Sequence, residues 1–95
     1  MPKAAVGRIV HVLVDPEVNN GSDVAPAVIV RAWTEECVNL RALLDGPETP
    51  WLTSYSLHES REALEDHAAL RQAELDETGP GQTVQLRGAF WPPHV

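Results

Sequence analysis

The stretch "AVIVRAWTEECVNLRALL", residues 27–44, decides the fold because it holds two strand-like segments joined by a short polar loop. Residues 27–34 and 38–44 are rich in aliphatic and β-branched side chains, and each segment is shorter than a typical helix. They are therefore predicted to pair as neighbouring antiparallel strands. The length of the loop between them sets which side chains share a face.

Two registers are open for this hairpin. A two-residue loop would place Ala32 opposite Asn39, whereas a three-residue loop ending at Cys37 would place Ala32 opposite Leu40. We prefer the three-residue loop because it leaves only apolar side chains on one face of the pair. The core residues predicted on this basis are Val28, Val30, Ala32, Val38, Leu40, Ala42 and Leu44.

The polar face of the same hairpin carries basic and aromatic side chains. The preferred register puts Arg31 directly opposite Arg41, on the same face as Trp33. Facing like charges are unfavourable by a few tenths to about 1 kcal/mol, and a bound anion would relieve this repulsion. In the last predicted strand, Arg87 and Trp91 share the polar parity. The candidate ligand-binding residues are therefore Arg31, Trp33, Arg41, Arg87 and Trp91.

Three further strand-like segments and one helix complete the chain. Residues 6–14 and 51–57 are predicted strands. Residues 59–77 are strong helix formers, and Ser56 and Glu59 before them have the spacing of a capping box. The connection between the first two strands is predicted to turn tightly at Asn20-Gly21.

The last predicted strand spans residues 82–91. Its alternation places Phe90 in the core and Trp91 on the polar face, and Gly88 is expected to be a bulge or bend. Pro92 and Pro93 have no backbone N–H to donate, so they are expected to end the sheet.

Four strands, one helix and one strand predict an α+β fold that is mostly β. We expect a single domain over residues 1–95, built as a small, bent five-stranded sheet or an SH3-like or OB-like barrel. The inserted helix (59–77) is expected to lie on the surface, because acidic side chains cover much of it.

Composition disfavours several classes of function. The chain has 95 residues and a net charge of −7, which makes duplex nucleic acid an unfavourable partner. Its single cysteine, Cys37, cannot form an intramolecular disulfide, and this fits the cytoplasm. The apolar stretches are short and interrupted by polar residues, so neither a membrane span nor a signal peptide is expected.

No catalytic or metal-binding pattern is present in the sequence. His11, His58, His67 and His94 have no metal-ligand spacing, and Cys37 has no C-x-x-C partner. The adjacent carboxylates of the chain do not converge on one substrate bond. We therefore expect a protein that is not an enzyme and needs no cofactor or metal.

Three interpretations of the arginine–tryptophan face remain open. The acidic helix could cover it, with tryptophans packing under the arginine stems. The face could instead be an oligomer interface, since Trp and Arg are enriched in interface hot spots. It could also bind an anionic, ring-bearing ligand, because guanidinium groups match phosphate geometry and indoles stack bases.

The strings "VGRIVHV", "PAVIVRAW", "VNLRALLDG" and "TSYS" occur in this order. The chain thereby resembles a group of small proteins encoded by tailed phages and prophages of actinobacteria, which open with a V-G-R-I-V-H-like strand. It departs from them in its long acidic helix and in its tail, "AFWPP". The resemblance implies a phage protein in the bacterial host cytoplasm, where some small phage oligomers inhibit host defence by sequestering nucleotide messengers.

The first hypothesis is a non-enzymatic, homo-oligomeric β-barrel that binds a nucleotide-like anion and inhibits host defence. The alternative is a protein-interaction module, or a virion or assembly accessory, that binds a host protein or its own kind through the acidic helix or an oligomer interface.

Overall fold

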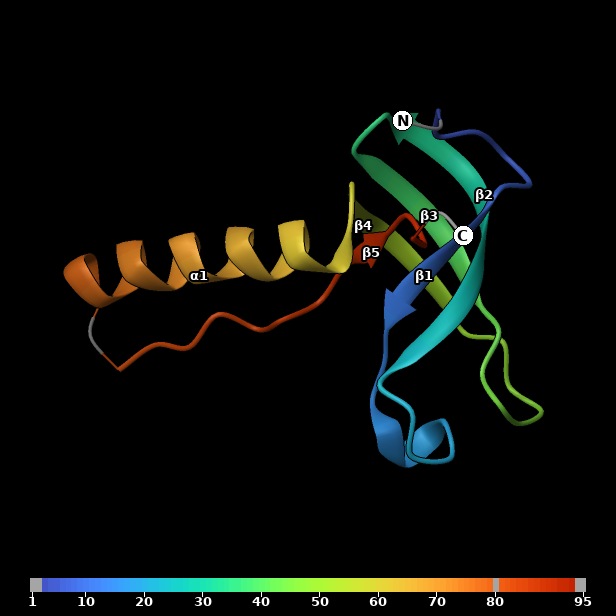
Figure 1. Cartoon of the computed structure of the whole chain (residues 1–95), viewed down its shortest axis with the longest axis horizontal. Helices are drawn as coiled ribbons and strands as arrows, with labels where there is room; N and C mark the ends of the chain where they lie inside the picture. The colour runs from blue at the N-terminus through green and yellow to red at the C-terminus, as the bar shows by residue number, and fades with distance from the viewer. Residues whose placement is uncertain (1–2, 80, 94–95) are drawn as a thin grey trace.

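The protein is a small barrel from which a long helix projects (Figure 1). The computed structural model describes residues 3–79 and 81–93. The elements in chain order are β1 (Ile9–Leu13), the 3-10 helix η1 (Pro16–Val18), β2 (Val24–Thr34), β3 (Cys37–Ala42), β4 (Trp51–His58), α1 (Arg61–Thr78) and β5 (Ala89–Phe90). The strands form a closed barrel in the order β1-β2-β3-β4-β5. The predicted class, a mostly β small barrel with one inserted helix, is confirmed.

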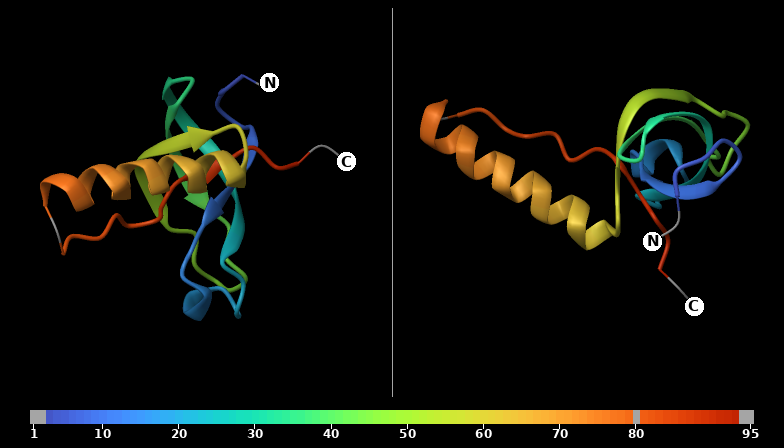
Figure 2. Two further views of the ribbon diagram at one scale, coloured as in Figure 1. Left: turned by 60° about the vertical axis from the view of Figure 1, so that its left-hand side comes forward. Right: turned by 90° about the horizontal axis from the view of Figure 1, so that it is seen from above.

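The shortest strand closes the barrel. β5 has two residues and pairs antiparallel with β1 and parallel with β4. Each strand thus lies beside its neighbours in sequence, and the strands form a ring, as the view from above shows (Figure 2, right).

Small and medium-sized aliphatic side chains fill the barrel. Ile29, Leu40 and three valines are its largest fully buried side chains. Four alanines, Leu57 and Trp91 complete the core, and the alanines fit because the interior of a small barrel leaves little room. The core cluster consists of Val10, Val12, Ala25, Ala27, Ile29, Val38, Leu40, Ala42, Leu57, Ala89 and Trp91.

The predicted register of the β2–β3 hairpin is wrong. Thr34 faces Cys37, so the loop has two residues rather than three. Ala32 faces Val38. The two registers considered from the sequence had placed Leu40 or Asn39 opposite Ala32. The ladder is shifted between Ile29 and Arg31 and again between Ala32 and Thr34. Each shift inserts one extra residue into β2, and such a β-bulge changes the register without changing the loop.

The consequence is that the predicted core side of β2 is wrong at Val28 and Val30 but correct at Ala32, which packs against the core cluster beyond the first bulge. Ile29 is fully buried, whereas Val30 is 40% exposed. Both parities of this strand are apolar, so its alternation did not identify the inward side. The core side of β3 is as predicted, with Val38, Leu40 and Ala42 buried. The tight turn predicted at Asn20-Gly21 is supported by positive φ angles at both residues, 49° and 91°.

The last strand is much shorter than predicted. Only Ala89 and Phe90 of residues 82–91 join the sheet. Phe90 is buried as predicted, at 4% exposure, and packs edge-on against His11 with ring centroids 5.7 Å apart. The predicted polar side of Trp91 is wrong, because Trp91 is only 8% exposed and belongs to the core cluster. Gly88 is buried with φ 153°, and a Cβ there would lie 2.8 Å from Cδ1 of Leu64. The backbone therefore bends at Gly88 where the chain enters the barrel.

Residues 81–87 run back beside α1, and we call this segment together with α1 the arm. The arm extends away from the barrel in both views of Figure 2. Its helix has 18 residues, which corresponds to about 27 Å. Leu64, in the first turns, is its only buried residue. The predicted helix was nearly correct in extent, although Ser60 is its N-cap and the predicted capping-box residue Ser56 lies in β4.

Two sets of contacts hold the arm. At its base, Arg61 forms an ion pair of 2.6 Å with Asp23 of the β1–β2 connection. Further out, the side-chain amide of Gln72 donates a hydrogen bond to the carbonyl oxygen of Gln82 and accepts one from the backbone N–H of Val84, at 2.9 and 2.8 Å. The barrel thus supports the base of the helix, and the returning chain supports its outer half.

Candidate functional site

The outward sides of β2, β3 and β4 form one polar and aromatic surface. Arg31 faces Asn39, and Arg41 faces Trp51 of β4. Directly opposed residues of antiparallel strands share a face, and Asn39 and Arg41 lie on one side of β3 because they are two residues apart. We call the surface formed by Arg31, Trp33, Asn39, Arg41 and Trp51 the outer face.

Asn39 organises this surface. It is only 7% exposed, and its side-chain oxygen accepts hydrogen bonds from Nε1 of Trp33 (3.0 Å), Oγ1 of Thr53 (3.2 Å) and the backbone N–H of Ser54 (2.8 Å). Ser54 has φ 54°, a left-handed conformation that L-residues rarely adopt. The buried amide therefore fixes both the indole of Trp33 and an irregular point of β4.

Two tryptophans and two arginines of the outer face are exposed to solvent. Trp33 is 51% and Trp51 is 54% exposed. The guanidinium of Arg31 lies 3.8 Å from the ring centroid of Trp33, which is a cation–π contact. Arg41 donates a hydrogen bond of 3.4 Å to the carbonyl oxygen of Thr49. These side chains present both apolar area and positive charge without being covered by the helix.

The structure thus unites three of the five predicted site residues and separates two. Arg31, Trp33 and Arg41 lie on the outer face. Trp91 is inside the barrel and only 8% exposed. Arg87 lies at the open end of the barrel, and its predicted place on a continuous strand beside the other arginines is wrong, because residues 82–88 are not in the sheet.

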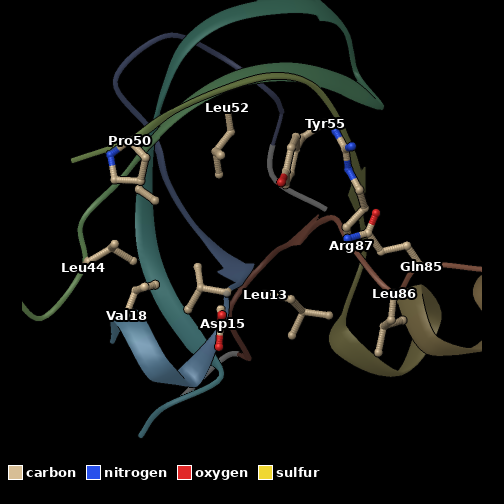
Figure 3. Close-up of a pocket in the computed structure, with 12 residues that line it drawn as sticks. Leu13, Asp15, Val18, Leu44, Pro50, Leu52, Tyr55, Gln85, Leu86 and Arg87 are labelled. Carbon is tan, nitrogen blue, oxygen red and sulfur yellow. The ribbon is translucent and has the colours of Figure 1, made fainter. Parts of the chain in front are cut away.

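Arg87 belongs to a cleft at the mouth of the barrel (Figure 3). The cleft has a volume of about 450 Å³. The Arg87 guanidinium lies 4.5 Å from the ring centroid of Tyr55, and Asp15 lines the same cleft. The apolar lining residues are Leu13, Val14, Val18, Ala42, Leu44, Pro50, Leu52 and Leu86.

A pair of histidines lies where α1 joins the barrel. The ring centroids of His58 and His67 are 5.4 Å apart, and Nε2 of His58 lies 3.0 Å from Oγ of Ser56. Partial burial lowers the pKa of His58, the positive charge of His67 lowers it further, and Glu36 opposes both effects. Within residues 3–79 and 81–93, no group of three or more His, Cys, Asp or Glu side chains is arranged to hold a metal ion.

Asn39 and Trp51 are the outer-face residues that were not among the predicted site residues. Trp51 begins β4, and no pattern in "WLTSYSL" relates it to Arg41 until the β3–β4 register is known. No protein-family model, curated protein or solved structure matches this chain. Across the part of the chain that the structure describes, no helix is long and apolar enough to cross a membrane.

Proposed function

We propose that this protein is a non-enzymatic protein-interaction module that binds its partner through the outer face. The observation that carries the proposal is the pair of half-exposed tryptophans, Trp33 and Trp51, set beside Arg31 and Arg41 on three adjacent strands. Trp and Arg are enriched in the residues that dominate the binding energy of protein interfaces. Asn39 holds Trp33 in place, so little side-chain entropy is lost when a partner covers that indole.

The shape of this surface favours a protein over a small ligand. Ligand sites are usually concave and bury most of the ligand. Among the clefts lined by described residues, four have volumes of about 430–450 Å³, and Arg31, Trp33, Arg41 and Trp51 line none of these four. A protein partner needs no such cleft, because it covers a broad and nearly flat area.

The biological setting follows from the sequence resemblance alone. A phage-encoded protein in a bacterial cytoplasm would use the outer face either on a host protein or on another copy of itself during assembly. Nothing in this role requires catalysis or a cofactor.

A capture experiment tests the proposal. Immobilised wild-type protein is compared with an Arg41→Ala/Trp51→Ala variant and with a control variant, Glu17→Ala/Val18→Ala. Val18 is 55% exposed, close to the value for Trp51, but lies at the barrel mouth. We expect the outer-face variant to capture at least ten-fold less partner protein than wild type. The control variant should capture as much as wild type. Equal capture by all three proteins would remove the outer face from this role.

The barrel-mouth cleft supports a second candidate function, the binding of a nucleotide-like anion. Here Arg87 would contact phosphate, and Tyr55, already stacked with Arg87, would contact the ring. Calorimetric titration with cyclic dinucleotides and ADP-ribose derivatives tests it. Binding that is lost in Arg87→Ala and retained in Arg41→Ala supports the cleft, and no heat with micromolar ligand contradicts it.

A further inference from the structure

We propose that the outer face binds the arm of a second copy of the same chain, so that the protein assembles head to tail. This inference rests on the proposed function and names its partner. It unites the two features that the barrel itself leaves uncovered: an acidic helix that projects into solvent, and a surface on which exposed tryptophans lie beside arginines.

The charges of the two surfaces are complementary. Arg31 and Arg41 are the only Lys, Arg, Asp or Glu residues in the five strands. Within the residues that the structure describes, the ion pairs are those of Arg61 with Asp23 and Glu65, so neither outer-face arginine has a carboxylate partner. By contrast, α1 has six acidic and two basic side chains, a net charge of −4. The acidic helix α1 and the charged strand residues, Arg31 and Arg41, therefore carry charges of opposite sign.

The helix presents a defined surface for such a contact. Successive helical residues are about 100° apart, so the side of α1 opposite the returning chain carries Glu62, Asp66, Leu70, Ala73 and Glu77. All five are exposed, and we call them the outer stripe. Leu70 is 67% exposed at its centre. A large apolar side chain beside carboxylates is the complement of tryptophans beside arginines.

The spacings of the two surfaces agree. Residues four apart on a helix have Cβ atoms about 5–6 Å apart, which applies to Glu62 and Asp66. Arg31 faces Asn39, two residues from Arg41, and such diagonal positions on a sheet are about 7–8 Å apart. One turn of helix is therefore long enough to pair both arginines, and Leu70 in the next turn then lies over the tryptophan beside the second arginine.

Arm-to-face docking uses different surfaces on the two copies. Such heterologous contacts close into a ring where the rotation permits and otherwise extend into a filament. The net charge of −7 opposes self-association in general, so the local complementarity of arm and face is required to overcome it. This makes removal of either surface a sharp test.

The experiment measures the mass in solution by sedimentation over a range of protein concentrations. The arm variant is Asp66→Ala/Leu70→Ala/Glu77→Ala, and the face variant is Arg31→Ala/Arg41→Ala/Trp51→Ala. All six side chains are exposed, and alanine is well tolerated in a helix. Circular dichroism confirms that each variant is folded. Glu17→Ala/Glu48→Ala, which changes two exposed carboxylates outside the arm, is the control.

Wild type and control are expected to exceed the monomer mass of 10.4 kDa increasingly with concentration. Each variant alone is expected to self-associate at least ten-fold more weakly. An equimolar mixture of the two variants retains one intact arm and one intact face, so it should form a heterodimer and nothing larger.

Three results overturn the inference: wild type that is monomeric up to millimolar concentration, an arm variant that self-associates like wild type, or a mixture that forms no heterodimer. The second result would indicate a symmetric face-to-face contact. A wild-type protein that is monomeric would leave the proposed function unaffected. That function fails only if the Arg41→Ala/Trp51→Ala variant captures the partner protein as well as wild type does.

Discussion

Asn39 accepts a 3.0 Å hydrogen bond from the indole nitrogen of Trp33, and this contact joins the stability of the barrel to the geometry of its outer face. The same oxygen holds Thr53 and the backbone of Ser54. One buried amide therefore connects three adjacent strands. The buried polar side chain of β3 has its structural reason here.

Replacing Asn39 with leucine is expected to destabilise the barrel by about 1–3 kcal/mol, because three part-buried hydrogen bonds lose their acceptor. For a domain of this size each 1 kcal/mol lowers the melting temperature by about 4–8 °C. Trp33→Phe removes only one of the three hydrogen bonds and should cost less. Thermal denaturation followed by circular dichroism measures both, and an Asn39→Leu variant as stable as wild type would contradict the role of the amide.

Gly88→Ala should destabilise the protein by about 1–3 kcal/mol through overpacking, since the added Cβ would lie 2.8 Å from Cδ1 of Leu64 and 3.0 Å from Oγ of Ser56. Shortening Leu64 to alanine relieves the closer of these contacts. The double variant should therefore lose less stability than the sum of the two single variants. Strict additivity in urea denaturation would show that the Leu64–Gly88 contact is not the cause.

Gln72→Ala should loosen the arm and leave the barrel unchanged. Its side chain makes both hydrogen bonds to the returning chain, with Gln82 and Val84, and the outer half of α1 has no buried residue to replace them. Hydrogen exchange should become faster in residues 70–84 and stay constant in β1 to β4. Glu74→Ala is the control on the same helix, because among the described residues its one hydrogen bond with a side chain uses its backbone carbonyl.

Acidification should destabilise the protein through His58. Its pKa in the folded state is lowered by partial burial and by His67, against the opposing effect of Glu36. The unfolded chain therefore binds more protons as the pH falls below the ordinary value of 6.5, and stability decreases from there down through the folded pKa. In NMR titration His67→Gln should raise the pKa of His58 toward its ordinary value. An unchanged His58 pKa would show that the two rings do not interact.

Local sequence patterns were sufficient to predict the secondary-structure elements and their order along the chain. The alternation of Val38, Leu40 and Ala42 identified the inward side of β3, because polar residues separate them. The composition of residues 59–77 predicted a helix that ends within one or two residues of the observed one. Both signals act within a few residues, where period and propensity determine the conformation.

Which residues lie together on the outer face depended on contacts between strands, and local sequence patterns do not encode those contacts. β2 is apolar on both parities, so the choice of Ile29 over Val30 as a core residue came from the two bulges and from closure of the ring. The same closure turned Trp91 inward and left Arg87 at the barrel mouth. By itself the sequence determined that this chain forms a small, mostly β barrel with an acidic helix. Only the tertiary structure decided which arginines and tryptophans meet, because a one-residue shift between strands exchanges their faces at little local cost.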